Sequence, residues 1–272
     1  MGTLLSTTLL SKFSVSLSSC RTLAILALLA STLACSPRSD AISASEDTLV
    51  VAAAADLARL EAPLARAFEQ ATGRRMRTVL GSSGMLARQI EQGAPYDVYL
   101  SADQEYVRKL VESGKLDAGT VSVYAVGRLG LWAKAATVRD LKQLTASGIR
   151  HLGIANPAHA PYGLAAREAL QNAGLWERLQ PKLVYGETVR QALQYAESGN
   201  ADVALTAWSL VFDKGGVLVT DSLHAPIRQT GAMVADSKRQ ALARQFLDML
   251  NGPAGQSILT SYGFWPPGTG AS

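Results

Sequence analysis

The chain has 272 residues, of which 48% are apolar and 18% are charged, and its formal net charge at pH 7 is +4. This is the composition of an ordinary globular chain, long enough for one large or two small domains. Much of the positive charge belongs to the N-terminal segment, so the composition gives no reason to expect a nucleic-acid-binding face.

The N-terminal segment, residues 1–34, has the layout of a secretory signal. It carries two basic residues, Lys12 and Arg21, no acidic residue, and an apolar run over residues 23–33 that is too short to span a membrane. Its removal lowers the formal charge from +4 to +2. One of the two cysteines, Cys20, is lost with it, so the mature chain has neither a disulfide nor a cysteine-based metal site.

The end of this segment predicts attachment to a lipid. Residues 32–35, Thr-Leu-Ala-Cys, resemble a lipoprotein signal box, in which Cys35 becomes the acylated N-terminus. Residues 35–47 are small, polar and Pro-containing, which suits a tether. Ordinary cleavage near Ala34 or Ala44 is the alternative. We therefore expect a periplasmic or other extracytoplasmic protein that meets the membrane only through a lipid anchor.

From residue 48 onward, predicted strands and helices alternate, which is typical of a parallel or mixed sheet flanked by helices. The predicted strands cover residues 49–54, 77–80, 98–100, 121–126, 129–133, 151–155, 183–185 and 227–234. The predicted helices cover residues 57–68, 85–91, 103–113, 164–172, 189–196 and 238–250. This order suggests two lobes joined by strands that cross near Gly127 and Gln229. We expect lobe I to comprise residues 48–126 and 230–268, and lobe II residues 127–229.

Small or polar residues occupy four of the predicted strand-to-helix junctions, at residues 55–56, 81–84, 156–163 and 186–188. A helix start leaves backbone N–H groups unpaired and carries the positive end of the helix dipole, so it attracts anions. In open α/β sheets, ligands lie at the carboxyl ends of strands. Four such ends would form an anion site from dipoles and neutral donors. For the clearest junction, Gly81-Ser82-Ser83-Gly84, a simple capped turn is the alternative.

No set of catalytic or metal-binding residues stands out elsewhere. The three histidines, His151, His159 and His224, lack the paired spacing of a metal site. The sequence has no nucleophile elbow, phosphate loop or dinucleotide fingerprint. Asp97 and Asp103 are expected to be a strand-edge acid and a helix cap. The sequence therefore favours a binding protein over an enzyme, with no cofactor and no metal ligands.

Several separated motifs resemble the extracytoplasmic molybdate-binding proteins of ABC importers. They are Gly81-Ser82-Ser83-Gly84, Leu86 to Ile90, Gly93 to Val98, Leu100 to Gln104, Asn156 to Gly163, Val189 to Leu193 and Tyr262-Gly263-Phe264. The resemblance implies a two-lobed type II periplasmic-binding-protein fold, with mixed sheets flanked by helices and two crossing strands as the hinge. It also implies a monomer that captures molybdate or tungstate and delivers it to the membrane permease of an ABC importer.

The resemblance further implies which residues bind the anion. Ser83 matches a serine that donates through its hydroxyl and its backbone N–H. Tyr162 and Val189 match positions that donate a backbone N–H. Ala55 falls where many relatives carry a hydroxyl residue, so only its N–H is expected to serve.

Departures from the family pattern leave fewer donors than usual. Ala207 stands where some relatives use a tyrosine, and the phenol of Tyr162 is the candidate that replaces part of the loss. Asp56 and Ser82 are additional candidates for contact with the anion. The alternative function is binding of another tetrahedral oxyanion, sulfate or phosphate. For a protonated phosphate, Asp56 would serve as the acceptor.

The proposed donors suit molybdate and tungstate, which are tetrahedral dianions that need donors and no acceptor. Hydroxyls and helix starts bind such an anion without the desolvation cost of a buried lysine or arginine. None of these donors titrates between about pH 6.5 and 9, so we expect the affinity to be nearly flat over that range. Sulfate has the same charge and shape at smaller size, so a rigid cavity radius must reject it.

Overall fold

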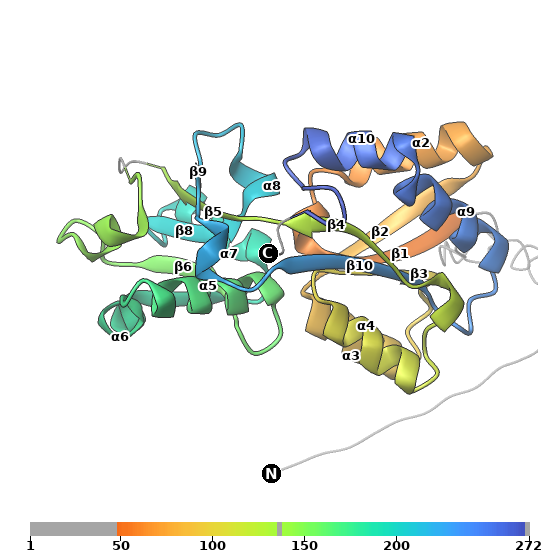
Figure 1. Ribbon diagram of the computed structural model, residues 1–272, viewed down its shortest axis with the longest axis horizontal. Helices are drawn as coiled ribbons and strands as arrows, with labels where there is room; N and C mark the ends of the chain where they lie inside the picture. The colour runs from red at the N-terminus through yellow and green to blue at the C-terminus, as the bar shows by residue number, and fades with distance from the viewer. Residues whose placement is uncertain (1–47, 135–137, 270–272) are drawn as a thin grey trace, which may run out of the picture. The chain divides into compact units, whose positions relative to one another are not determined.

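The strands of the computed structural model, which describes residues 48–134 and 138–269, form two five-stranded sheets (Figure 1). In the first sheet the order is β2-β1-β3-β10-β4, and both sheets lie within one compact unit. β1 is parallel to β2 and β3, whereas β10 is antiparallel to β3 and β4. The bounds of these strands are β1 Thr48–Ala54, β2 Arg75–Gly81, β3 Val98–Ser101, β4 Ser122–Gly127 and β10 Ile227–Met233.

The second sheet has the order β7-β6-β8-β5-β9 and is also mixed. β6 is parallel to β7 and β8, and β5 is antiparallel to β8 and β9. The bounds are β5 Leu129–Ala133, β6 Leu152–Ala155, β7 Leu183–Gly186, β8 Val203–Ala207 and β9 Val217–Leu218. Two mixed sheets flanked by helices confirm the predicted fold class.

Helices cover both faces of the sheets (Figure 1). On the first sheet, α2 and α9 pack with β1 around Phe68 and Phe246, while α3 and α4 pack on the opposite face around Tyr99. On the second sheet, α5 packs against β6 and β8 from one side, and α7 packs against Gly153 and Ala204 from the other. The helices are η1 Ala55–Leu57, α2 Glu61–Thr72, α3 Ser83–Glu91, α4 Gln104–Glu112, η2 Ala118–Thr120, η3 Leu141–Thr145, α5 Pro161–Asn172, α6 Trp176–Leu179, η4 Gln180–Lys182, α7 Val189–Ser198, α8 Trp208–Val211, η5 Asp221–Leu223, α9 Gln240–Asn251 and α10 Pro253–Ser261.

The chain crosses between the sheets twice, once between β4 and β5 and once before β10 (Figure 1). At the first crossing, the guanidinium of Arg128 lies 4.4 Å from the ring centroid of Trp265 and 5.9 Å from that of Trp208. Trp265 also pairs with Val126 through two backbone hydrogen bonds of 2.8 and 3.0 Å. β4 ends at Gly127, and Gln229 lies inside β10, so the two residues at which we expected the crossings both belong to strands of the first sheet.

The observed elements differ from the predicted ones mainly at helix ends. The helix expected from residue 57 is a three-residue 3-10 turn, η1, followed by α2 from Glu61. The stop expected at residues 251–253 is followed at once by α10, because Pro253 is tolerated as the first residue of a helix. Strand β8 is fully buried and carries no alternating pattern, which is why periodicity did not single it out.

Some sequence-based expectations lie outside the described residues: the signal segment 1–34, the tether 35–47 and acylation at Cys35. Among the residues that are described, no helix combines the length and the apolar character needed to cross a membrane.

Candidate functional site

The four predicted junctions converge on one cavity. The β1–η1, β2–α3, β6–α5 and β7–α7 connections all contribute to its wall, and its volume is about 10 Å3. The residues that line the cavity are Ala54, Ala55, Asp56, Gly81, Ser82, Ser83, Ala102, Ala160, Pro161, Tyr162 and Val189. They include all six residues that the sequence proposed for anion contact. A space of this size corresponds to about one water molecule, so a larger solute enters only if the lining moves outward.

Ser83 is held so that its hydroxyl hydrogen can be donated. It is the first residue of α3 and is fully buried. Its Oγ accepts a 3.0 Å hydrogen bond from the N–H of Ala102, and its carbonyl accepts a 2.7 Å bond from the Tyr99 hydroxyl. Because a hydroxyl has one hydrogen and two lone pairs, accepting from Ala102 leaves that hydrogen for a ligand. Its backbone N–H belongs to the helix start and has no partner within the helix.

The hydroxyl of Ser82 is engaged differently. It lies 2.9 Å from Nδ1 of His159, whose Nε2 lies 3.3 Å from Glu187. The N–H of Gly84 donates to the carbonyl of His159 at 2.9 Å. These contacts join the start of α3, which packs on the first sheet, to the loop before α5, which packs on the second. Ser82 lines the cavity, and its hydroxyl is paired with His159.

Val189 presents its backbone N–H at the start of α7. The preceding residue, Thr188, caps the helix by accepting from the N–H of Gln191 at 3.1 Å, as the sequence pattern predicts. The side chain of Gln191 accepts from the N–H of Glu187, one residue earlier than in the usual capping box. On the other side of Val189, Thr206 donates to its carbonyl at 3.0 Å. The first turn of α7 is thus fixed from two directions.

Ala55 and Tyr162 lie at the two remaining starts. Ala55 is the first residue of η1, and Tyr162 is the second residue of α5, after Pro161. Both are almost completely buried. Pro161 has no N–H and suits the first helical position, so Tyr162 is the first residue of α5 with an N–H to donate.

The phenol of Tyr162, the candidate that would replace part of the missing donors, belongs to a buried polar cluster at the hinge. Gln229 of β10 donates to Oδ2 of Asp56 at 2.7 Å and lies 3.4 Å from the Tyr162 hydroxyl. Tyr124 of β4 donates to the other end of the Gln229 amide at 3.1 Å. A Cβ atom on Gly127 would lie 2.2 Å from the Tyr162 hydroxyl, so the cluster fits only against a glycine.

Asp56 is the unusual member of this cluster. It is completely buried, and within the described part of the chain its Oδ1 has no hydrogen-bond partner. Burial raises the pKa of Asp56 from 3.8 to about 6, against the lowering effects of Tyr162 and Gln229. The Tyr162 hydroxyl is therefore close to the carboxyl, although it does not meet hydrogen-bond geometry with Oδ1. The same burial raises the pKa of Tyr162 well above its usual value.

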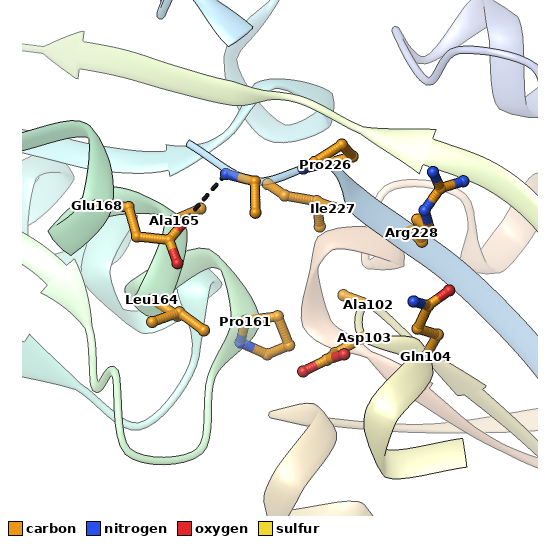
Figure 2. A pocket seen from close by; sticks show the side chains of 11 residues that line it. Ala102, Asp103, Gln104, Pro161, Leu164, Ala165, Glu168, Pro226, Ile227 and Arg228 are labelled. Carbon is orange, nitrogen blue, oxygen red and sulfur yellow. Dashed lines mark hydrogen bonds between the residues drawn. The ribbon is translucent and has the colours of Figure 1, made fainter. Parts of the chain in front are cut away.

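A larger groove of about 250 Å3 lies next to this cavity and shares Ala102 and Pro161 with it (Figure 2). Its wall carries two carboxylates, Asp103 and Glu168, and the guanidinium of Arg228. Glu168 accepts from the N–H of Ala225 at 2.9 Å, shown by the dashed line in Figure 2. The carboxylates of the groove repel a dianion, whereas the small cavity brings four helix starts together, so the small cavity is the better anion site despite the carboxyl of Asp56.

Sequence reasoning placed the junctions correctly but missed the cluster around Asp56. Gln229 is 173 residues away from Asp56 along the chain, and no local pattern links them. The two acids that the sequence assigned to structural roles do have them. Asp103 caps α4 through the N–H of Glu105, and buried Asp97 accepts from the N–H of Val50 and from Ser237.

Two sheets linked by two crossings, with helix starts from both around one small cavity, define a two-lobed solute-binding protein. In agreement, the family model for bacterial extracellular solute-binding proteins matches residues 49–265. The sequence is 37% identical over 228 residues to the molybdate-binding protein ModA of Rhodobacter capsulatus, covering 82% of this chain and 90% of that protein.

Two further comparisons agree. The structure matches the periplasmic molybdate-binding protein of Azotobacter vinelandii with a TM-score of 0.77 at 32% identity, covering 80% of this chain and 99% of that one. The chain is also 31% identical over 195 residues to YvgL of Bacillus subtilis, provisionally named an ABC transporter substrate-binding lipoprotein, covering 68% and 73%. The chain belongs to the molybdate-binding family of bacterial extracellular solute-binding proteins. These relatives are solute-binding proteins by name.

Proposed function

We propose that this protein captures molybdate outside the cytoplasm and presents it to the permease of an ABC importer. The observation that carries this function is the convergence of four helix starts and the Ser83 hydroxyl on one small cavity. Backbone N–H groups and helix dipoles bind a dianion without a buried cation. The ModA relatives support molybdate as the anion, in preference to sulfate or phosphate.

Tungstate is the second ligand that we propose, because it has the same charge and tetrahedral shape as molybdate. Sulfate is the relevant competitor, and only size distinguishes it. The donors of this cavity sit on helix starts that are anchored to two different sheets, so the cavity radius is set by the packing of whole elements. An anion that is too small leaves donors without partners, and each such donor lowers the affinity.

Titration calorimetry of the purified protein with molybdate, tungstate and sulfate tests this function. We expect one molybdate per chain, similar heat with tungstate, and affinity for sulfate at least about a hundredfold weaker, equivalent to about 3 kcal/mol. Equal affinity for sulfate and molybdate would show that the protein binds tetrahedral oxyanions without selecting molybdate. A failure to bind molybdate at all would contradict the proposal.

We also propose that the mature protein is a monomer anchored to a membrane through acylated Cys35. The Thr-Leu-Ala-Cys sequence at residues 32–35 and the polar tether that follows support the anchor, as does the name given to the relative YvgL. An anchor of this kind keeps the protein near the permease while the two lobes remain in the aqueous phase.

Cell fractionation tests the anchor. We expect the full chain to sediment with membranes and the Cys35→Ser variant to accumulate unprocessed or to appear in the soluble fraction. A soluble wild-type protein whose N-terminus maps downstream of residue 35 would show ordinary cleavage instead. Molybdate binding by the isolated variant should be unchanged, because Cys35 precedes the first strand.

A further inference from the structure

Asp56 poses a physical problem at the proposed molybdate site. Asp56 lines the cavity and is completely buried. Its Oδ1 has no hydrogen-bond partner among the described residues. A buried acceptor without a partner is costly, and a buried carboxylate more so. The other oxygen, Oδ2, is already occupied by the amide of Gln229 at 2.7 Å. Oδ1 is therefore the atom whose state remains to be explained.

A carboxylate beside a dianion would oppose binding. Two negative charges that share a water-excluded site interact strongly, and the usual result is that one of them takes up a proton. A proton on Oδ1 turns this unpartnered acceptor into a donor. It also supplies an O–H at the β1–η1 junction, where Ala55 provides no side-chain donor. One proton thus removes the repulsion and adds a hydrogen bond.

We propose that Asp56 binds the anion as the neutral acid, so that capture of one dianion is coupled to uptake of one proton. The step consumes a carboxylate, a solvent proton and a free dianion, and yields a carboxylic acid hydrogen-bonded to the bound dianion. Asp56 is then a ligand residue of the site and makes its affinity depend on pH, in place of the nearly flat dependence expected from the sequence, which counted only donors that do not titrate. This inference rests on the proposed function and deepens it.

The surroundings of Asp56 favour this coupling. The groups that face it are Tyr162 from α5, Tyr124 from β4, the neutral amide of Gln229 from β10 and the backbone N–H groups of Asp56 and Leu57. None of the largest influences on its pKa comes from a lysine, arginine or histidine, and burial holds that pKa near 6. At pH 7.5 the free protein therefore carries mostly the carboxylate, and a bound dianion raises the pKa further.

Calorimetry in two buffers of different ionisation enthalpy, with sodium molybdate as the ligand, tests the coupling. At pH 7.5 we expect an uptake of about one proton per anion, and about tenfold weaker binding per pH unit between pH 7 and 8.5. Asp56→Asn keeps the shape of the side chain and presents a permanent amide donor. We expect this variant to bind molybdate with no proton uptake and no such pH dependence.

His159→Gln is the control, because the His159 imidazole lies 2.9 Å from the hydroxyl of Ser82, which lines the cavity, and an imidazole can itself carry a proton. Uptake of one proton should persist in this variant, and its loss there would assign the proton to His159 and overturn the inference. Molybdate binding by the unsubstituted protein without proton uptake would also overturn it, while leaving the proposed function intact. Absence of molybdate heat at every pH would instead contradict the function itself.

Discussion

At the scale of single residues, two adjacent serines of one motif have different tasks. The Ser83 hydroxyl accepts from Ala102 and keeps its hydrogen for the cavity, whereas the Ser82 hydroxyl is paired with His159. The sequence names both serines as candidates, but it cannot separate them, because the distinction depends on partners 19 and 77 residues away. Long-range contacts of this kind leave no trace in a local pattern.

Ser83→Ala should therefore weaken molybdate binding by roughly ten- to a hundredfold, the equivalent of losing one hydrogen bond to a charged group. Ser82→Ala is the matched control and should weaken binding less, since its hydroxyl is paired with His159. Calorimetry gives the affinities, and thermal unfolding without ligand shows whether either change acts through stability. An equal loss in both variants would mean that the hydroxyl of Ser83 acts only as a structural contact.

At the scale of elements, the sequence predicts well where a strand passes into a helix. It predicts less well the exact residue at which each helix begins. Apolar runs followed by small or polar residues identify β1, β2, β6 and β7, because those signals are local. The start of α2 is four residues later than expected, and β8 and α10 were not recognised. Their formation depends on burial against other elements, which periodicity does not register.

The contact between α3 and the loop before α5 depends on a glycine. A Cβ atom on Gly84 would lie 2.9 Å from both the Cβ and the carbonyl oxygen of His159, which is closer than such atoms approach. Gly84→Ala should push these two elements apart and weaken molybdate binding by at least about tenfold, because the donors of the two sheets no longer reach one anion together.

Gly148→Ala is the control for this change, since an added Cβ at that exposed glycine meets no atom within 4 Å. We expect its affinity to equal that of the unsubstituted protein in the same calorimetric assay. If Gly84→Ala binds as tightly as this control, the α3 contact with His159 is not needed for a closed cavity.

At the scale of the whole molecule, the buried carboxyl of Asp56 sets a pH dependence of stability. Its folded pKa, about 6, lies above the usual value of 3.8, so the folded state holds this proton more tightly than the unfolded state does. Its contribution is therefore most favourable below about pH 4 and is lost as the pH rises through about 6. The loss amounts to about 3 kcal/mol, since one pKa unit corresponds to about 1.4 kcal/mol.

Asp56→Asn should remove this loss, so that without ligand the variant is more stable than the parent at pH 8 by up to about 3 kcal/mol, with no difference near pH 4. Urea unfolding at the two pH values measures this difference in the free energy of unfolding.

Asp97→Asn should have the opposite effect at pH 8, because Asp97 is hydrogen-bonded by Val50 and Ser237 and paired with Arg239. A destabilised Asp56→Asn variant at pH 8 would show that the ionised carboxyl is well accommodated.

The first crossing has an optical consequence. Trp208 follows β8 of the second sheet, Trp265 pairs with β4 of the first, and the guanidinium of Arg128 lies over both indole rings. Indole emission responds to the distance and orientation of a nearby cation. Any rotation of one lobe against the other changes that geometry at both rings, so the unmodified chain contains its own fluorescent reporter of opening and closing.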